Sequence, residues 1–97
     1  MKSIYKYELI NEVNKFAVPG MGHVLHVGLD PRNVPCMWIA VDTNEPDVDI
    51  EVVMIGTGWP LDFMEADSRD WYFAGTLKEG IYMWHVFYAN VLDRSGE

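Results

Sequence analysis

The sequence predicts an all-β domain, either a small antiparallel sandwich or a barrel-like meander of six to seven strands. Short stretches alternate between apolar and polar residues with a period of two, and turn residues recur between them. No stretch of ten or more residues has a convincing helical pattern, so the crossover helices of a parallel α/β fold are missing. We expect strands that are neighbours in sequence to pair, as in a meander.

The first half of the chain contains three predicted strands. Residues 3–9 alternate, with Tyr5 and Tyr7 on the predicted inner face, and residues 10–14 are open to a short helical turn. A Pro19–Gly20 turn leads to a second strand over residues 22–29. Residues 30–33 form a predicted turn, because proline presets φ and asparagine tolerates the left-handed region. Residues 36–42 are almost continuously apolar, which predicts a central strand buried on both faces.

The second half begins with a loop over residues 43–48 and an alternating strand over residues 49–55. Residues 61–70 are predicted to form either an irregular excursion or one helical turn. Residues 71–77 and 80–89 read as a closing hairpin, with Gly80 supplying a positive φ in its short turn. We expect a single domain over residues 1–97, with residues 90–97 as a frayed tail.

Charge and cysteine content narrow the classes of function. The 97 residues carry 15 acidic and 7 basic side chains, for a formal net charge of −8. This balance disfavours nucleic acid and anionic membranes as partners, although a few amides can still hold a small anion. Cys36 is the only cysteine and is expected to be buried, so no internal disulfide forms and a cytoplasmic location is expected. No apolar run approaches the roughly 20 residues of a membrane span, and no signal-peptide pattern opens the chain.

The block Gly56-Thr57-Gly58-Trp59-Pro60 is the first candidate site. Its two glycines permit a tight turn and the close approach of a ligand, while Thr57 offers a hydroxyl beside amides that can form an anion nest. A β-bulge or a corner of the sheet is an equally good interpretation. No lysine follows the glycines, so this is not a phosphate-binding loop. Trp59 lies in a turn, where it is available to stack on a flat ligand or to fill a partner's pocket.

The histidines give the second set of candidates. His23 and His26 point to opposite faces of a regular strand and cannot both ligate one metal, so neither a metal site nor a cofactor is expected. His85 shares a strand face with Phe87, as either a hydrogen-bonded interior histidine or a ligand contact, and Trp84 lies on the other face. No catalytic residue is predicted. The predicted ligand-binding residues are Gly56, Thr57, Gly58, Trp59, Trp84, His85 and His26.

The remaining charged residues have plainer interpretations. The acidic stretch from Asp42 to Glu51 is read as a solvated face rather than a calcium site, because the glycine-pivoted spacing of a calcium loop is missing. Arg32 and Arg69 lie in predicted loops, where each either caps an anionic ligand or is simply exposed to solvent.

Six short blocks occur in this order along the chain: Ile4–Tyr7, Val24–Val27, Trp38–Asp42, Gly56–Pro60, Gly75–Thr76 and Trp84–Phe87. Together they resemble a family of small, functionally uncharacterised proteins from tailed bacteriophages and prophages. Trp59 departs from the pattern, since histidine is expected more often there, which puts chemistry at this position in doubt and leaves binding intact. The resemblance implies a phage setting and gives no activity.

Three functions follow as hypotheses. The first is a non-enzymatic protein that sequesters a small ligand, such as a nucleotide-derived signal of antiviral defence, in pockets of a homo-oligomer. Trp59 or Trp84 would stack on the base, while the glycine amides and His85 or His26 would donate to a phosphate. The second is an interaction module that inhibits a host protein through an edge strand, with acidic loops that mimic nucleic acid. The third and least favoured is a small hydrolase or lyase that pairs His85 with an aspartate.

Overall fold

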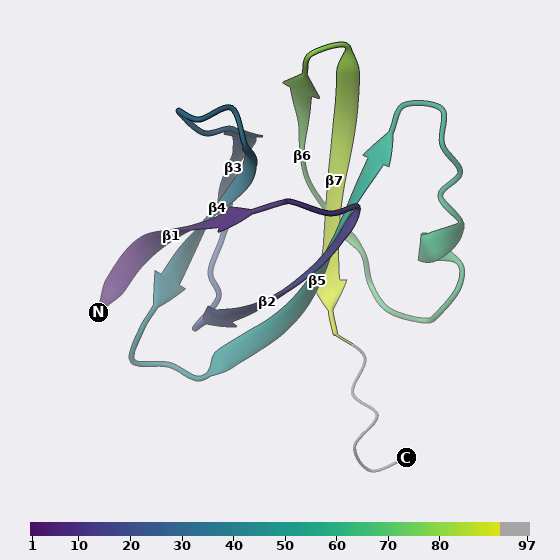
Figure 1. The fold of residues 1–97 in the computed structure, drawn as a ribbon. Coiled ribbons are helices and arrows are strands. Elements are labelled where there is room, and N and C mark those ends of the chain that lie inside the picture. Colours follow the sequence, from purple (N-terminus) through teal and green to yellow (C-terminus); the bar gives the residue numbers. More distant parts are fainter. Residues whose placement is uncertain (92–97) are drawn as a thin grey trace.

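The computed structural model describes residues 1–91, which form seven strands in two antiparallel sheets (Figure 1). The predicted all-β class is therefore confirmed. The strands are β1 (Lys2–Glu8), β2 (Val13–Pro19), β3 (Val24–Leu29), β4 (Pro35–Asp42), β5 (Asp47–Gly56), β6 (Tyr72–Glu79) and β7 (Tyr82–Asn90). The predicted tail over 90–97 is wrong at its start, because Asn90 belongs to β7 and the Val91 amide donates to the Asp49 carbonyl at 3.0 Å. The rest of that prediction, residues 92–97, lies outside the described residues.

The strand order does not follow the predicted meander. One sheet has the order β1-β4-β3 and the other β2-β5-β7-β6, so only β3–β4 and β6–β7 pair as sequence neighbours. The segment between β1 and β2 crosses from one sheet to the other, so these two sequence neighbours do not pair. The helical turn considered for residues 10–14 does not form, because Val13 and Asn14 already belong to β2. The Leu9 amide donates to the Pro35 carbonyl of one sheet, and the Glu12 carbonyl accepts from the Met54 amide of the other, both at 2.8 Å.

The core lies between the two sheets. It is built from apolar side chains of six strands and of the β1–β2 connection, namely Leu9, Val18, Val27, Met37, Ile39, Val41, Ile50, Val52, Met54, Leu77 and Val86. β4 is buried on both faces, as predicted, since the neighbouring side chains Cys36 and Met37 are both 0% exposed. Burying these side chains supplies the main stabilisation of a chain this small.

Two turns behave as their residues predict. Asn33 has φ of 64° in the β3–β4 turn, and Gly80 has φ of 59° between β6 and β7. The first turn is organised by the buried carboxylate of Asp30, which accepts from the amides of Arg32 at 2.8 Å and Val34 at 3.0 Å. These backbone bonds, the Val34 bond first, and the Lys6 ammonium at 3.0 Å hold the pKa of Asp30 far below its ordinary value.

The longest connection runs from β5 to β6 and contains the short 3-10 helix η1 (Asp62–Met64), which agrees with the predicted single helical turn. Phe63 of η1 packs against Trp71 and Phe87, with ring centroids 4.9 and 5.7 Å apart. The connection therefore folds back on the β7 face that carries Phe87, outside the main core. At three residues, the one helical element of the described chain is far too short to cross a lipid bilayer.

Candidate functional site

The Gly56–Trp59 turn and His85 are neighbours in the structure. Gly56 pairs with Trp84 across β5 and β7, so the turn begins beside the imidazole. The Thr57 hydroxyl lies 2.7 Å from Nε2 of His85, and the Thr76 hydroxyl lies 3.0 Å from Nδ1. A neutral imidazole has one donor and one acceptor, so one threonine donates to the ring and the other accepts from it. The threonine that accepts keeps its own hydroxyl hydrogen for another partner.

The turn itself is a compact β-turn. The Trp59 amide donates to the Gly56 carbonyl at 3.0 Å, and Gly58 has φ of 91° at the third position, as a type II turn requires. The Trp59 indole folds back over Gly56, where a Cβ would lie only 2.8 Å from Cε2 of the ring. Gly56 is therefore needed so that the Trp59 ring can approach the backbone closely. The Trp59 amide already bonds the Gly56 carbonyl, so it is not free to donate to a ligand.

A cavity of about 220 Å³, which we call the His85 hollow, opens beside this turn. Its lining is mostly apolar and comes from β5, β6, β7 and the β5–β6 connection: Ile55, Gly56, Thr57, Gly58, Trp59, Leu61, Phe73, His85 and Phe87. Trp59, Leu61 and Phe73 are 43%, 47% and 60% exposed, so the hollow is open to solvent. None of these nine lining residues is a lysine or an arginine.

Arg69 fixes the long connection that supplies Trp59 and Leu61. Its guanidinium bonds the Asp67 carboxylate at 2.8 and 3.0 Å, Glu51 of β5 at 2.9 Å and the Asn90 carbonyl at 3.1 Å, and it lies over the Trp71 ring at 4.7 Å. The sequence suggested that Arg69 either caps an anionic ligand or is exposed to solvent. Neither holds, because only 14% of its side chain is exposed and its guanidinium is bonded within the chain. The Arg69 bonds lower the pKa of Asp67, and Asp67 in turn raises the pKa of Arg69.

The other sequence-predicted arginine has a different setting. Arg32 lies in the β3–β4 turn, is 67% exposed and bonds the Glu8 carboxylate at 2.6 Å. It lines neither the His85 hollow nor the second cavity described next.

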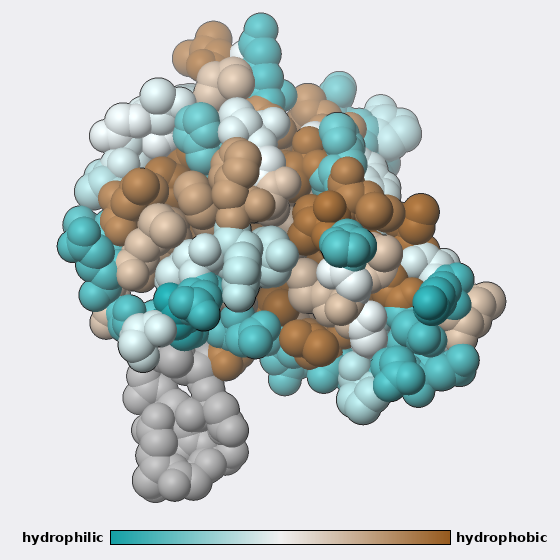
Figure 2. All heavy atoms as spheres, turned by 180° about the vertical axis from the view of Figure 1, so that it is seen from behind, coloured by the Kyte–Doolittle hydropathy of each residue, from teal (hydrophilic) through white to brown (hydrophobic). Residues whose placement is uncertain are grey.

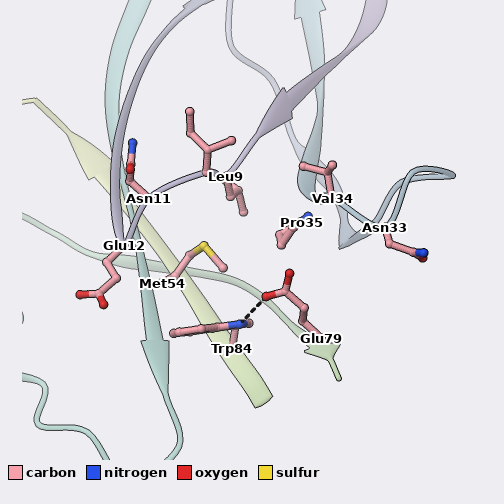
Figure 3. Close-up of a pocket in the computed structure, with 10 residues that line it drawn as sticks. Leu9, Asn11, Glu12, Asn33, Val34, Pro35, Met54, Glu79 and Trp84 are labelled. Carbon is pink, nitrogen blue, oxygen red and sulfur yellow. Dashed lines mark hydrogen bonds between the residues drawn. The ribbon is translucent and has the colours of Figure 1, made fainter. Parts of the chain in front are cut away.

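Trp84 faces that second cavity, of about 440 Å³, which we call the end cavity (Figure 3). It lies where the β1–β2 and β3–β4 connections approach β5 and the β6–β7 hairpin, and its lining is Leu9, Ile10, Asn11, Glu12, Asn33, Val34, Pro35, Met54, Glu79 and Trp84. The Trp84 indole N–H donates to Oε1 of Glu79 at 3.1 Å. Sequence reasoning missed Glu79, which appeared there only as a turn residue of the closing hairpin.

The predicted site residues thus divide between two cavities. Gly56, Thr57, Gly58, Trp59 and His85 line the His85 hollow and Trp84 lines the end cavity. One lining residue of each cavity is in contact with one of the other: the Trp59 and Trp84 rings lie edge to face with centroids 5.4 Å apart. His26 lies elsewhere, on the other sheet, at 5.4 Å from the Trp38 ring and close over Gly28. It lines neither cavity.

Side chains of the metal-ligating types are dispersed. Within residues 1–91, no group of three or more histidine, cysteine, aspartate or glutamate side chains is placed to hold a metal ion. In the acidic stretch, Asp42 binds the amino terminus at 3.4 Å and Glu51 binds Arg69, whereas Asp47 and Asp49 are exposed. His85 bonds two threonine hydroxyls, whereas the hydrolase hypothesis pairs it with an aspartate.

Comparison with curated proteins and with solved structures found no match. One family matches residues 1–95, which is almost the whole chain. The expectation of an uncharacterised family is confirmed at this coarser level. The chain belongs to the family described as a domain of unknown function, DUF7352.

Proposed function

We propose that this protein is a non-enzymatic binding module that holds a flat small molecule in the His85 hollow. The observation that carries the proposal is the Thr57–His85–Thr76 chain of hydrogen bonds at the edge of an open, aromatic-lined cavity. Ligand sites commonly combine mostly apolar walls with a few fixed polar groups, and the hollow has this composition.

The hydrogen-bond chain supports recognition rather than bond cleavage. Both imidazole nitrogens are occupied by hydroxyls, so the ring is held in one orientation. Of the two threonines, only Thr57 lines the hollow. We propose the tautomer with its hydrogen on Nε2, in which Thr57 accepts from the ring and keeps its own hydroxyl hydrogen for a guest. Phe73 and Phe87, with centroids 5.4 Å apart, offer aromatic surface to a flat ring beside this hydroxyl. A heteroaromatic ring with an acceptor on its edge suits both features.

A nucleobase is the concrete guest that we propose, as part of a nucleotide-derived signal. The base would lie against the aromatic walls, while any phosphate would extend toward solvent, because the lining holds no lysine or arginine. The setting of phage counter-defence belongs to this proposal: the motif resemblance suggests the phage setting, and the counter-defence role is part of what we propose. Sequestration would need no catalytic group.

The open side of the hollow supports a homo-oligomer. The exposed side chains of Trp59, Leu61 and Phe73 border the hollow, and a second copy of the chain that covers them would close it around a guest. Burial of these side chains between copies would also remove apolar surface from water.

Native mass spectrometry with pooled nucleosides and cyclic and linear nucleotides tests this proposal, because it reports oligomer mass and bound ligand together. We expect retention of an unmodified guest, and weaker retention by Thr57→Val, which keeps the side-chain shape and removes the hydroxyl. Thr43→Val is the matched control, since the Thr43 hydroxyl bonds the Met1 carbonyl away from the hollow. Absence of any bound guest, or equal binding by both variants, would reject the proposal, and turnover would favour an enzyme.

A second candidate, an interaction module for a host protein, is favoured by the tip of the β6–β7 hairpin. Ile81, Tyr82 and Met83 are 91%, 57% and 43% exposed, and Figure 2 shows that hydrophobic side chains reach the surface among hydrophilic ones. Exposed apolar patches mark interaction sites in many proteins. Loss of pull-down of one host protein by Ile81→Ser, with ligand binding intact, would favour this role.

A further inference from the structure

The end cavity has a charge pattern that the His85 hollow lacks. Glu12 and Glu79 are its only charged lining residues, and no lysine, arginine or histidine is among the ten. Figure 3 shows the Glu12 side chain directed away from the cavity, whereas the Glu79 carboxylate lies between Trp84 and Pro35. One negative charge therefore dominates the interior of this cavity.

The Glu79 carboxylate is only partly satisfied by the chain. Its Oε1 accepts the Trp84 indole N–H at 3.1 Å, and its other oxygen points toward Pro35, on the far side from the indole (Figure 3). Glu79 is half-buried, and this second oxygen has no hydrogen-bond partner among the described residues. A carboxylate in such a position binds most favourably to a donor that carries positive charge.

The rest of the cavity suits the apolar part of such a donor. Figure 3 shows the Trp84 indole edge-on, with one ring face toward Met54 and Leu9. Leu9 and Met54 are 2% and 5% exposed and form part of the main core, so this wall is rigid and apolar. Val34 and Pro35 close the opposite side. An aromatic face next to a carboxylate attracts organic cations by both charge and cation–π contact.

We propose that the end cavity binds a small organic cation, a primary ammonium group on an apolar body, with the ammonium at Glu79 and the body against Trp84 and Met54. An anion would meet the Glu79 charge, and a neutral guest would leave that charge without a partner. The cavity volume of about 440 Å³ lies within the usual range for small-ligand sites. This site is separate from the His85 hollow and does not depend on the function proposed there.

Titration calorimetry with 2-phenylethylammonium, 2-phenylethanol and phenylacetate tests the inference on the full chain. We expect the ammonium compound to bind about tenfold or more tightly than the alcohol, and phenylacetate not to bind, because a charge-assisted bond is worth at least that factor. Glu79→Gln keeps an acceptor for the Trp84 N–H and removes the charge, so it should abolish the preference for the ammonium compound. Glu65→Gln, an exposed change in the β5–β6 connection, is the control.

Two further measurements keep the result interpretable. If Glu79→Gln disturbs folding, the preference for the cation in the unaltered protein should still fall with added salt, while any binding of the alcohol should not. Thr57→Val should leave binding of the ammonium compound unchanged, which separates this site from the His85 hollow. Equal affinity for ammonium and alcohol, no binding of either, or an unchanged preference in a folded Glu79→Gln protein would overturn the inference.

Discussion

The indoles of Trp59, in the lining of the His85 hollow, and Trp84, in the lining of the end cavity, meet at an interplanar angle of 88°. The pair therefore links the two linings. A second ring, Tyr82, stacks on Trp84 with centroids 5.9 Å apart. A change at Trp59 should therefore be felt in both linings.

Trp59→Ala should weaken binding in the His85 hollow and leave the domain folded. Trp59 is 43% exposed, so its loss removes one edge-to-face aromatic pair rather than part of the core. We expect a cost of about 1 kcal/mol in the free energy of unfolding and a fall in Tm of about 4–8 °C. Thermal unfolding followed by circular dichroism measures this. A much larger fall would mean that Trp59 supports the fold itself.

Gly56→Ala should displace the Trp59 ring, because the new Cβ would lie 2.8 Å from Cε2 of the indole. The near-ultraviolet circular dichroism of the tryptophan pair should change and Tm should fall. In a Trp59→Ala background the same substitution has no ring to displace. Its effect should shrink there, and equal effects in both backgrounds would show that the clash is not the cause.

Arg69→Ala should loosen the connection between β5 and β6. The substitution removes bonds to Asp67, Glu51 and the Asn90 carbonyl and leaves two carboxylates without their cation, at a cost of about 1–3 kcal/mol. Limited proteolysis and amide exchange over residues 57–71 should show faster opening there than in Arg32→Ala, the exposed control. The pKa of Asp67, followed by NMR titration, should rise toward its ordinary value of 3.8.

Acid should destabilise the protein partly through Asp30. Its folded-state pKa is depressed below the ordinary value of 3.8, first by the Val34 amide and then by Lys6. The contribution of this carboxylate to the free energy of unfolding is therefore fully present above pH 3.8. The contribution is lost as the pH falls from 3.8 toward the depressed pKa. Urea unfolding at neutral and acidic pH measures how far the free energy of unfolding falls in acid. This fall should be smaller for Asp30→Asn than for the unaltered protein, and Asp30→Asn should be less stable at neutral pH. Asp49→Asn, on the exposed side of β5, should behave like the unaltered protein.

Cys36 should resist thiol reagents in the folded state. The side chain is 0% exposed, and desolvation is the main cause of its raised pKa, so both access and thiolate formation are opposed. A colorimetric disulfide reagent should label the thiol only when urea unfolds the domain. Fast labelling without denaturant would mean that β4 opens locally.

Local sequence signals predicted six of the seven strands and predicted their partners badly. The strand β2 was missed, because no strand was expected between residues 9 and 22. Alternation in β5 and the glycine of the β6–β7 turn are properties of a few adjacent residues, so they can be read directly from the chain. The pairing of Lys2 with Asp42 and of Val13 with Val53 depends on contacts between distant segments. The bonds of Leu9 and Glu12 to different sheets also leave no local signature.

The residues of the two cavities are also brought together by contacts between segments that are distant in the sequence. Thr57 lies close to His85 because β5 pairs with β7, a pairing that the expected meander does not contain. Both residues were named as candidates from their residue types, and their contact could not be read from the sequence. The bonds of Glu79 and Arg69 gave no local signal either, because their partners Trp84 and Glu51 reach them only through tertiary contacts. His26 lies on the other sheet because β3 pairs with β4 and not with β7.

The strand order also dictates when each part of the chain can become structured during synthesis. β1 has its hydrogen-bonding partner in β4 and cannot gain its backbone bonds until the ribosome has released residues up to Asp42. β2 pairs with β5 and has to wait until residues up to about Val53 are released. Such distant pairing carries a large loop-closure cost and favours slow folding. The nascent amino-terminal half therefore presents unpaired β segments for much of translation, an interval in which a chaperone or a second nascent chain can reach them.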